Sequence, residues 1–109
     1  METRAKIYLA DPDIAVVRFL RSTLEPQGYR VQEAMDWGQI PEEVNLFGAG
    51  LVLLSTDVPG VYYGDLVRQL KSDPRTRDVP LLVLVAGTDQ RGIRDGLEQG
   101  ADDFVLKPV

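Results

Sequence analysis

The stretch VPLLVLVAGTDQRGIRDGLEQGADDFVLKP, residues 79–108, contains two short continuous apolar runs, Leu81–Ala86 and Phe104–Leu106. Runs of this length are typical of strands buried on both faces of a parallel sheet. Between them, Ile93 and Leu97 lie four residues apart, a spacing typical of one face of a helix. The stretch therefore predicts a strand, a helix and a second strand.

The same alternation extends towards the N-terminus. Three more apolar runs occur, the middle one weaker than the others: Ile7–Ala10, Tyr29–Glu33 and Leu51–Leu54. Helical spacing recurs at Ile14, Val17, Leu20 and Leu24, and again at Leu66, Val67 and Leu70. Strands that alternate with helical segments in this way imply a parallel sheet with helices on both faces.

Turn and capping residues mark the expected ends of these helices. The candidates are Gly28 after the first helix, Asp73-Pro74 after the third, and Thr88 or Asp89 before the last. Gly38 and Pro41 interrupt residues 36–47, so this segment has the weakest helical pattern.

The composition excludes several classes of function. The 109 residues fit one domain, and a net charge of −5 argues against non-specific nucleic-acid binding by this segment. The chain has no cysteine for a disulfide or thiolate metal site, and no histidine for a Ser–His hydrolase. The N-terminal METRAK is not a signal segment, and no run approaches the roughly 18 apolar residues of a membrane span. We therefore expect a cytoplasmic domain without a membrane partner.

Polar residues follow several strands, where ligands bind in open parallel sheets. They are Asp11 and Asp13, then Ser55, Thr56 and Asp57, then Ala86, Gly87 and Thr88, and finally Lys107-Pro108. Carboxylates, a hydroxyl and a lysine at one edge form an acidic pocket that could hold Mg²⁺ or be neutralised by the lysine. Alternatively, the acidic residues only cap helices and solvate turns.

Four segments resemble the receiver domain of response regulators, the CheY-like family with a flavodoxin-like fold. The most specific are Gly100-Ala101-Asp102-Asp103 followed by Lys107-Pro108, and LKSDPRTRDVP at residues 70–80. LVLLSTDVPG, residues 51–60, and IYLADPDIAVVRFLR, residues 7–21, are similar to the third and first strands with the segments that follow them. The resemblance implies a three-layer α/β/α sandwich with strand order 2-1-3-4-5. It covers residues 1–109 as a single domain, which we expect to be truncated before the last helix.

The sequence departs from the family pattern at three site positions. With the register set on Pro59-Gly60, Ser55 occupies the position of the phosphoacceptor aspartate. The acidic pair of the first strand becomes Asp11-Pro12, and the hydroxyl residue that ends the fourth strand becomes Val85. Lys107 is retained, and Phe104 occupies the position of the family's switch aromatic.

These departures argue against phosphoryl transfer. A carboxylate is ionised at neutral pH, whereas a serine hydroxyl needs a base, and no histidine is available. The loss of one carboxylate weakens a Mg²⁺ site, which leaves Asp11 and Asp57, with Asp13 as a further candidate, as its ligands. Val85 cannot donate a hydrogen bond to a phosphoryl group.

Asp57 offers an alternative. It lies two residues beyond Ser55 and could replace the acceptor, although we expect it to be displaced from Lys107. Its expected structural role is to fix the turn before Pro59 by a side-chain-to-backbone hydrogen bond. Lys107 also has a structural interpretation, in which it pairs with Asp11 and needs no ligand.

The leading hypothesis is therefore an atypical receiver of a two-component phosphorelay that is not an enzyme and acts through protein contacts. Its partners would be a histidine kinase, an output domain or a second copy, contacted around residues 88–106, with Val85 and Phe104 as switch or interface residues. The alternative is a phosphoryl-accepting receiver that uses Asp57 with Mg²⁺. A nucleotide-binding enzyme is disfavoured because Gly60, Gly64 and Gly87 are too scattered to form a phosphate cradle.

Overall fold

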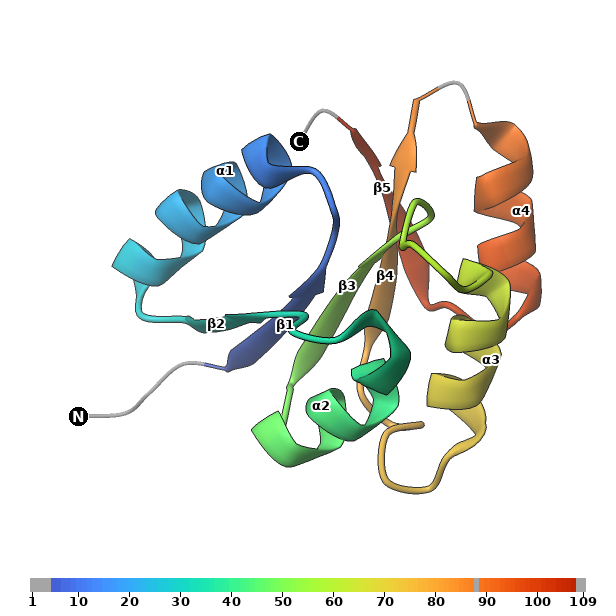
Figure 1. Cartoon of the computed structure of the whole chain (residues 1–109), viewed down its shortest axis with the longest axis horizontal. Helices are drawn as coiled ribbons and strands as arrows, with labels where there is room; N and C mark the ends of the chain where they lie inside the picture. Colours follow the sequence, from blue (N-terminus) through green and yellow to red (C-terminus); the bar gives the residue numbers. More distant parts are fainter. Residues whose placement is uncertain (1–4, 88, 108–109) are drawn as a thin grey trace.

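Five parallel strands form one sheet in the order β2-β1-β3-β4-β5 (Figure 1). The strands are β1 (Lys6–Ala10), β2 (Arg30–Glu33), β3 (Leu51–Ser55), β4 (Leu81–Ala86) and β5 (Asp103–Lys107). The structure is a computed structural model that describes residues 5–87 and 89–107. The chain reverses its direction across the sheet between β2 and β3, since β1 lies between these two strands. This confirms the order that the family resemblance implies.

Four α-helices connect the strands, with short 3₁₀ turns at two places. They are α1 (Ile14–Leu24), α2 (Ile40–Phe47), α3 (Tyr63–Ser72) and α4 (Gln90–Glu98), with the turns η1 (Glu25–Gln27) and η2 (Trp37–Gln39). Within the described residues, no helix is long and apolar enough to cross a membrane.

An aspartate caps the N-terminus of both α1 and α4. The Asp13 carboxylate accepts hydrogen bonds from the Ala15 and Val16 amides, and Asp89 accepts one from the Gly92 amide. Of the two residues considered for the start of α4, Asp89 is therefore the cap, and Thr88 lies outside the described residues.

The segment 36–47 is divided rather than continuous. Asp36 accepts a hydrogen bond from the Gly38 amide and caps η2, and α2 begins afterwards. Pro41 lies in the first turn of α2, where no intrahelical donor is required, so it starts the helix and does not break it.

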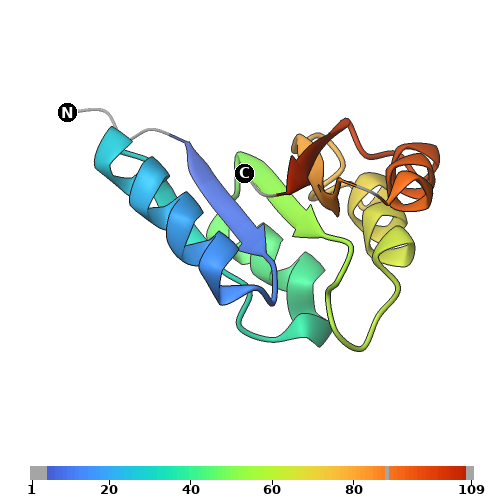
Figure 2. The same cartoon turned by 90° about the horizontal axis from the view of Figure 1, so that it is seen from above.

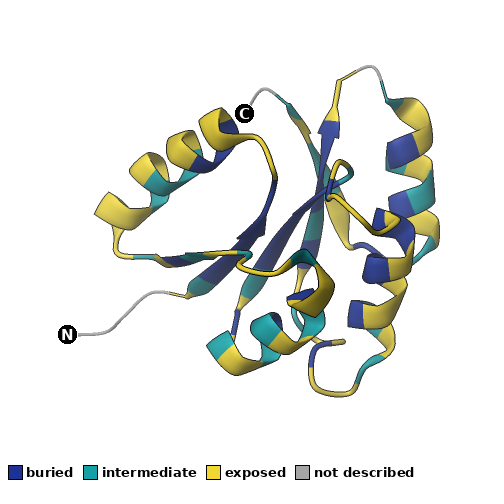
Figure 3. Cartoon of the chain, in the orientation of Figure 1, coloured by how far each residue is buried: buried dark blue, intermediate teal, exposed yellow. Residues whose placement is uncertain are grey.

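Apolar residues form one buried cluster on each face of the sheet. Figure 3 shows the central strands coloured as buried. The cluster on the side of α2 and α3 includes Tyr8, Ala10, Val52, Leu54, Ile40, Val44, Leu66, Val67 and Leu70. The cluster under α1 includes Ile7, Leu9, Val16, Val17, Val31, Leu53 and Leu84. Successive strand residues thus face opposite layers, which is the three-layer arrangement.

One strand prediction needs correction. The apolar run Phe104–Leu106 predicted a strand buried on both faces, but β5 is the edge strand and none of its residues is fully buried. Leu106 is 46% exposed. An edge strand has a neighbour on one side only, and a continuous apolar run does not distinguish it from a central strand.

Helices α3 and α4 lie side by side at the β5 end of the sheet, as both views show (Figure 2). Their close approach depends on Gly96, where a Cβ atom would lie 3.1 Å from Val83 Cγ2 and 3.6 Å from the Tyr63 ring. The Tyr63 hydroxyl donates a buried hydrogen bond of 2.7 Å to the Gly92 carbonyl. Burial raises the pKa of Tyr63 well above its usual range.

Candidate functional site

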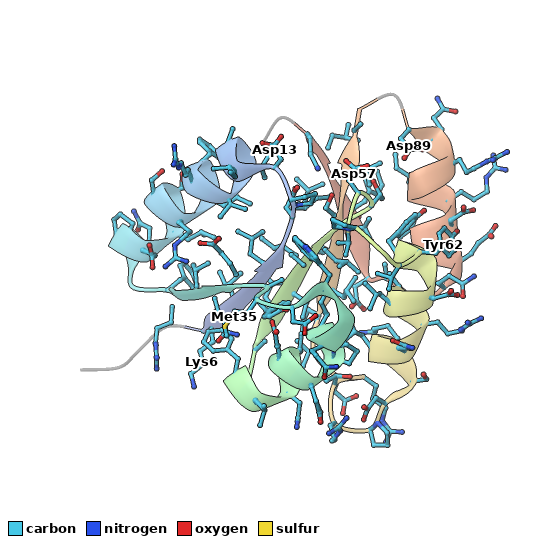
Figure 4. All side chains as sticks on the ribbon, in the orientation of Figure 1. Lys6, Asp13, Met35, Asp57, Tyr62 and Asp89 are labelled. Carbon is cyan, nitrogen blue, oxygen red and sulfur yellow. The ribbon has the colours of Figure 1, made fainter. Side chains whose placement is uncertain are left out.

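The carboxyl ends of β1, β3 and β5 bring Asp11, Ser55 and Lys107 together. Parallel pairing aligns Ala10 with Leu54, so the residues that follow them in sequence leave the sheet at the same edge. Figure 4 shows Asp13 and Asp57 at this edge. The convergence predicted for the strand ends is therefore present in the tertiary structure.

Lys107 is the centre of this cluster. Its Nζ lies 2.9 Å from Asp11 Oδ2, donates a 3.0 Å hydrogen bond to Ser55 Oγ, and lies 3.6 Å from Asp57 Oδ2. The lysine side chain is 13% exposed. One ammonium group therefore contacts both strand-end residues and the carboxylate of the following loop.

The Asp11 carboxylate is fully buried and held at both oxygens. Oδ1 accepts a hydrogen bond of 2.9 Å from the Asp13 amide. Oδ2 has no directed hydrogen bond within the described part of the chain, and the Lys107 ammonium compensates its charge by proximity. A buried carboxylate requires such a partner, because an unpaired charge in the interior is strongly unfavourable.

Ser55 is completely buried, and its hydroxyl oxygen accepts two hydrogen bonds. The donors are Lys107 Nζ and the Asp57 amide, each at 3.0 Å. Both groups donate to the hydroxyl oxygen and neither accepts its proton, so these contacts do not activate Ser55 as a nucleophile.

The structure corrects two expectations for Asp57. It is not displaced from Lys107, since the two groups are 3.6 Å apart, although the Asp57 side chain is 68% exposed. The hydrogen bond that shapes the turn also runs in the other sense: Ser55 supplies the side-chain acceptor and Asp57 supplies the backbone donor. Sequence analysis missed this because serine and aspartate can both accept such a bond.

The other predicted site residues occupy different environments. Asp13 caps α1, and both hydrogen bonds of its side chain go to that helix. Pro12 is exposed, whereas Val85 is fully buried in the core and offers no surface to a partner. The burial of Val85 argues against a role in an interface, because this side chain faces the apolar cluster on the α2 and α3 side of the sheet. Phe104 is half-buried against the same cluster.

The carboxylates at this edge are engaged by other groups, which makes them a poor donor set for a magnesium ion. Among residues 5–87 and 89–107, no three acidic, histidine or cysteine side chains are grouped as metal ligands. Asp11 is engaged with Lys107, Asp13 caps a helix, and Pro12 has no side-chain oxygen. Mg²⁺ requires oxygen ligands in near-octahedral geometry, and a lysine ammonium within 3 Å of the central carboxylate opposes it electrostatically.

Sequence analysis did not identify the role of two tyrosines beside this site. Tyr62 and Tyr63 connect the loop after β3 to α4, and their ring centroids are 5.1 Å apart. The Tyr62 hydroxyl donates a hydrogen bond of 2.9 Å to Asp95, which raises the pKa of this tyrosine. The two tyrosines are adjacent in the sequence, but their hydrogen-bond partners lie about 30 residues further along the chain.

A doubly wound parallel sheet with a carboxylate and a lysine at its carboxyl edge defines a class of small α/β signalling domain. The chain belongs to the response regulator receiver domain family, whose sequence profile matches residues 7–109.

Comparisons with individual proteins support this assignment. The chain is 38% identical over 106 residues to the response regulator PleD of Caulobacter vibrioides, which covers 96% of this chain and 23% of PleD. Its structure is similar to that of the chemotaxis response regulator CheY4 of Vibrio cholerae, with a TM-score of 0.87, 21% identity, and coverage of 98% and 89% of the two chains. It is also similar to the receiver domain of the sensor histidine kinase PA1611 of Pseudomonas aeruginosa. That comparison has a TM-score of 0.84, 22% identity, and coverage of 96% and 86%. That receiver has a magnesium ion in its active-site cleft.

Proposed function

We propose that this receiver of a two-component response regulator signals through protein contacts, without accepting a phosphoryl group. The observation that carries the proposal is Ser55, which is fully buried at the position of the family's acceptor aspartate, with its hydroxyl oxygen 3.0 Å from Lys107 Nζ. In phosphoryl transfer, cationic groups neutralise the charge on the transferred group. In the unmodified chain, the Lys107 ammonium is already paired with Asp11 and hydrogen-bonded to Ser55.

The neighbouring substitutions support the same proposal. Ser55 is buried and lacks a base, and Pro12 supplies no metal ligand. Val85 is buried and lacks a hydrogen-bond donor. Each substitution removes a different requirement of phosphoryl transfer: the nucleophile, the metal site and a contact to the transferred group.

We assign the contact surface to α4 and β5. Leu97 and Leu106 are 42% and 46% exposed. Phe104, two residues before Leu106, is half-buried and is the candidate switch. The partners we propose are a histidine kinase, an output domain or a second copy of the chain, in the cytoplasm. The net charge of −5 argues against direct contact with nucleic acid by this segment.

Asp57 supports a second candidate function, phosphoryl acceptance outside the family's usual position. Its carboxylate is 68% exposed and lies 3.6 Å from Lys107, so a donor could reach it beside a cation. Against this, Asp11, the other carboxylate at this edge that could hold Mg²⁺, is paired with Lys107.

Intact-mass spectrometry after incubation with Mg²⁺ and acetyl phosphate separates the two functions. We expect no added phosphoryl mass, with a phosphorylatable receiver as the positive control. An adduct that persists in Ser55→Ala and is lost in Asp57→Asn would replace the first proposal by the second. A titration with Mg²⁺ followed by the fluorescence of Trp37, the single tryptophan, should show no saturable change below about 10 mM.

A further inference from the structure

Strand β2 leaves one edge of the sheet open, at the opposite side from β5. It is a terminal strand that pairs with β1 alone. The Ala34 amide donates a hydrogen bond of 2.9 Å to the Leu9 carbonyl. Because backbone amides alternate in direction along a strand, the amides of Val31 and Glu33 point away from β1. These groups form a template for one more strand.

Two overlapping hollows lie along this edge. The first, of about 450 Å³, lies towards α2 and is lined by Lys6, Arg30, Gln32, Met35, Glu43, Leu46 and Phe47. The second, of about 490 Å³, shares Arg30, Gln32, Met35 and Phe47 and extends past Val31 and Glu33 to Arg21 of α1. Every second side chain of an added strand would point to the side of α2, into the first hollow.

Exposed apolar side chains line the same edge. Met35 is 82% exposed and Leu46 is 81% exposed, the highest values among the large apolar residues described. Figure 4 shows Lys6 and Met35 close together, and both line the first hollow. Exposed apolar surface that is gathered around a groove is typical of an interaction site.

The charge at this edge is positive, although the whole chain has a net charge of −5. Neither Lys6 nor Arg30 has a carboxylate within ion-pair distance in the described part of the chain. The nearby carboxylates are engaged elsewhere: Glu33 pairs with Arg21, and Glu43 accepts hydrogen bonds from Tyr8, Met35 and Asp36. Lys6 Nζ lies 5.6 Å from the centre of the Phe47 ring and remains available to an anion.

We propose that the β2 edge docks an extended segment of a partner protein that presents both apolar side chains and carboxylates to the α2 side of the strand. The segment adds to the sheet as a strand beside β2. Its apolar side chains contact Met35, Leu46 and Phe47, and its carboxylates pair with Lys6 and Arg30. This surface is separate from α4 and β5, so the proposal does not depend on the function proposed above.

A second copy of the chain does not fit this edge. Symmetric antiparallel pairing of β2 with itself places residues of the same sheet face opposite each other. Even-numbered residues would then face even-numbered ones, so Arg30 would face Arg30, Gln32 or Ala34 and never the oppositely charged Glu33. In none of these registers does Arg30 face a carboxylate, which favours an acidic partner instead.

Selection from a random dodecapeptide phage library on the immobilised chain tests the proposal. We expect the enriched peptides to carry apolar and acidic residues two positions apart, on one face of the added strand. A synthetic peptide of the enriched sequence should bind the K6E/R30E variant at least roughly tenfold more weakly than the unmodified chain, and binding should weaken with salt. The matched control is R77E/R91E, which changes the net charge equally at two exposed arginines away from β2.

Backbone amide exchange locates the peptide. Binding should slow exchange at Val31 and Glu33 if the peptide adds as a strand. If K6E/R30E fails to fold by circular dichroism, K6Q/R30Q replaces it, with a smaller loss expected. The proposal is overturned by a failure to enrich peptides or by enriched peptides without acidic residues. Equal binding of the peptide to K6E/R30E and to the control R77E/R91E also overturns it. Protection that maps to another element also overturns it.

Discussion

The Tyr62 hydroxyl donates a 2.9 Å hydrogen bond to Asp95 and so joins the residue that precedes α3 to α4. The adjacent Tyr63 makes a second, buried connection to the Gly92 carbonyl at 2.7 Å. The loop that carries Asp57 is thereby attached to the surface that we assign to signalling, without the involvement of a phosphoryl group. If these tyrosine hydrogen bonds had a formed and a broken state, a change at the Asp57 loop would be coupled to α4.

The hydrogen bond to Asp95 predicts an altered titration of Tyr62. Since Asp95 raises the pKa of Tyr62 above 10.0, ionisation disfavours the folded state: the stabilisation is complete below pH 10.0 and is lost as the pH rises through the folded-state pKa. In Asp95→Asn, the pKa of Tyr62 should fall towards 10.0. Ultraviolet difference titration measures this, with Tyr62→Phe identifying the signal. An unchanged titration curve in Asp95→Asn would show that the link is not formed in solution.

Loss of Lys107 should destabilise the fold through Asp11. Lys107→Met leaves the buried carboxylate without its cation, and we expect a decrease of about 3–5 kcal/mol in the free energy of unfolding. The double variant K107M/D11N should recover a substantial part, because it no longer buries an unpaired charge. Urea denaturation measures both, with the exposed Arg94→Met as control. A single variant as stable as the control would contradict a structural ion pair.

Ser55→Ala tests the hydroxyl as an acceptor. The substitution leaves the Asp57 amide and one Lys107 donor without their partner, which should decrease the free energy of unfolding by about 1–2 kcal/mol. We also expect faster amide exchange at Asp57. Thr56→Ala, at the next position and outside these hydrogen bonds, is the control. Similar exchange rates in both variants would argue against the Ser55 contacts.

The Lys71–Asp102 pair predicts part of the acid sensitivity. Burial alone would raise the pKa of Asp102, but the hydrogen bonds from Lys71 and the Leu81 amide outweigh it, and the net pKa lies below 3.8. The carboxylate therefore stabilises the fold above pH 3.8, and this contribution is lost as the pH falls through its folded-state pKa.

Asp102→Asn should be less stable at neutral pH by about 1 kcal/mol or less, since the carboxyl is half exposed. The difference from the unmodified chain should shrink on acidification. Thermal denaturation as a function of pH measures this, with the exposed Asp78→Asn as control. A difference that is constant with pH would exclude the ionised carboxylate as its cause.

The apolar side chains on α4 and β5 predict self-association at high concentration. Leu97 and Leu106 are both more than 40% exposed. Sedimentation velocity should show a concentration-dependent dimer that L97D/L106D abolishes. Leu46→Asp, which lies on α2 and is 81% exposed, should leave it unchanged. A strictly monomeric chain at every concentration would rule out a homodimer through this surface.

Local patterns predicted most of the fold. The continuous apolar runs located β1, β3 and β4, and the Asp13 and Asp89 caps mark where α1 and α4 begin. These features depend on interactions within a few residues, so they are visible in the order of amino acids alone. The division of residues 36–47 and the exposure of β5 were less apparent, because both depend on which elements pack alongside.

The sequence by itself determined which residues reach the functional edge: Asp11, Ser55 and Lys107 each end or follow a parallel strand. Only the tertiary structure decided how they interact. Lys107 meets Ser55 across 52 positions of sequence, and the loop path brings Asp57 within 3.6 Å of the same ammonium group. The common direction of the parallel strands specifies the end of the sheet at which these side chains lie. Loop geometry and burial determine the partner that compensates the charge of each side chain.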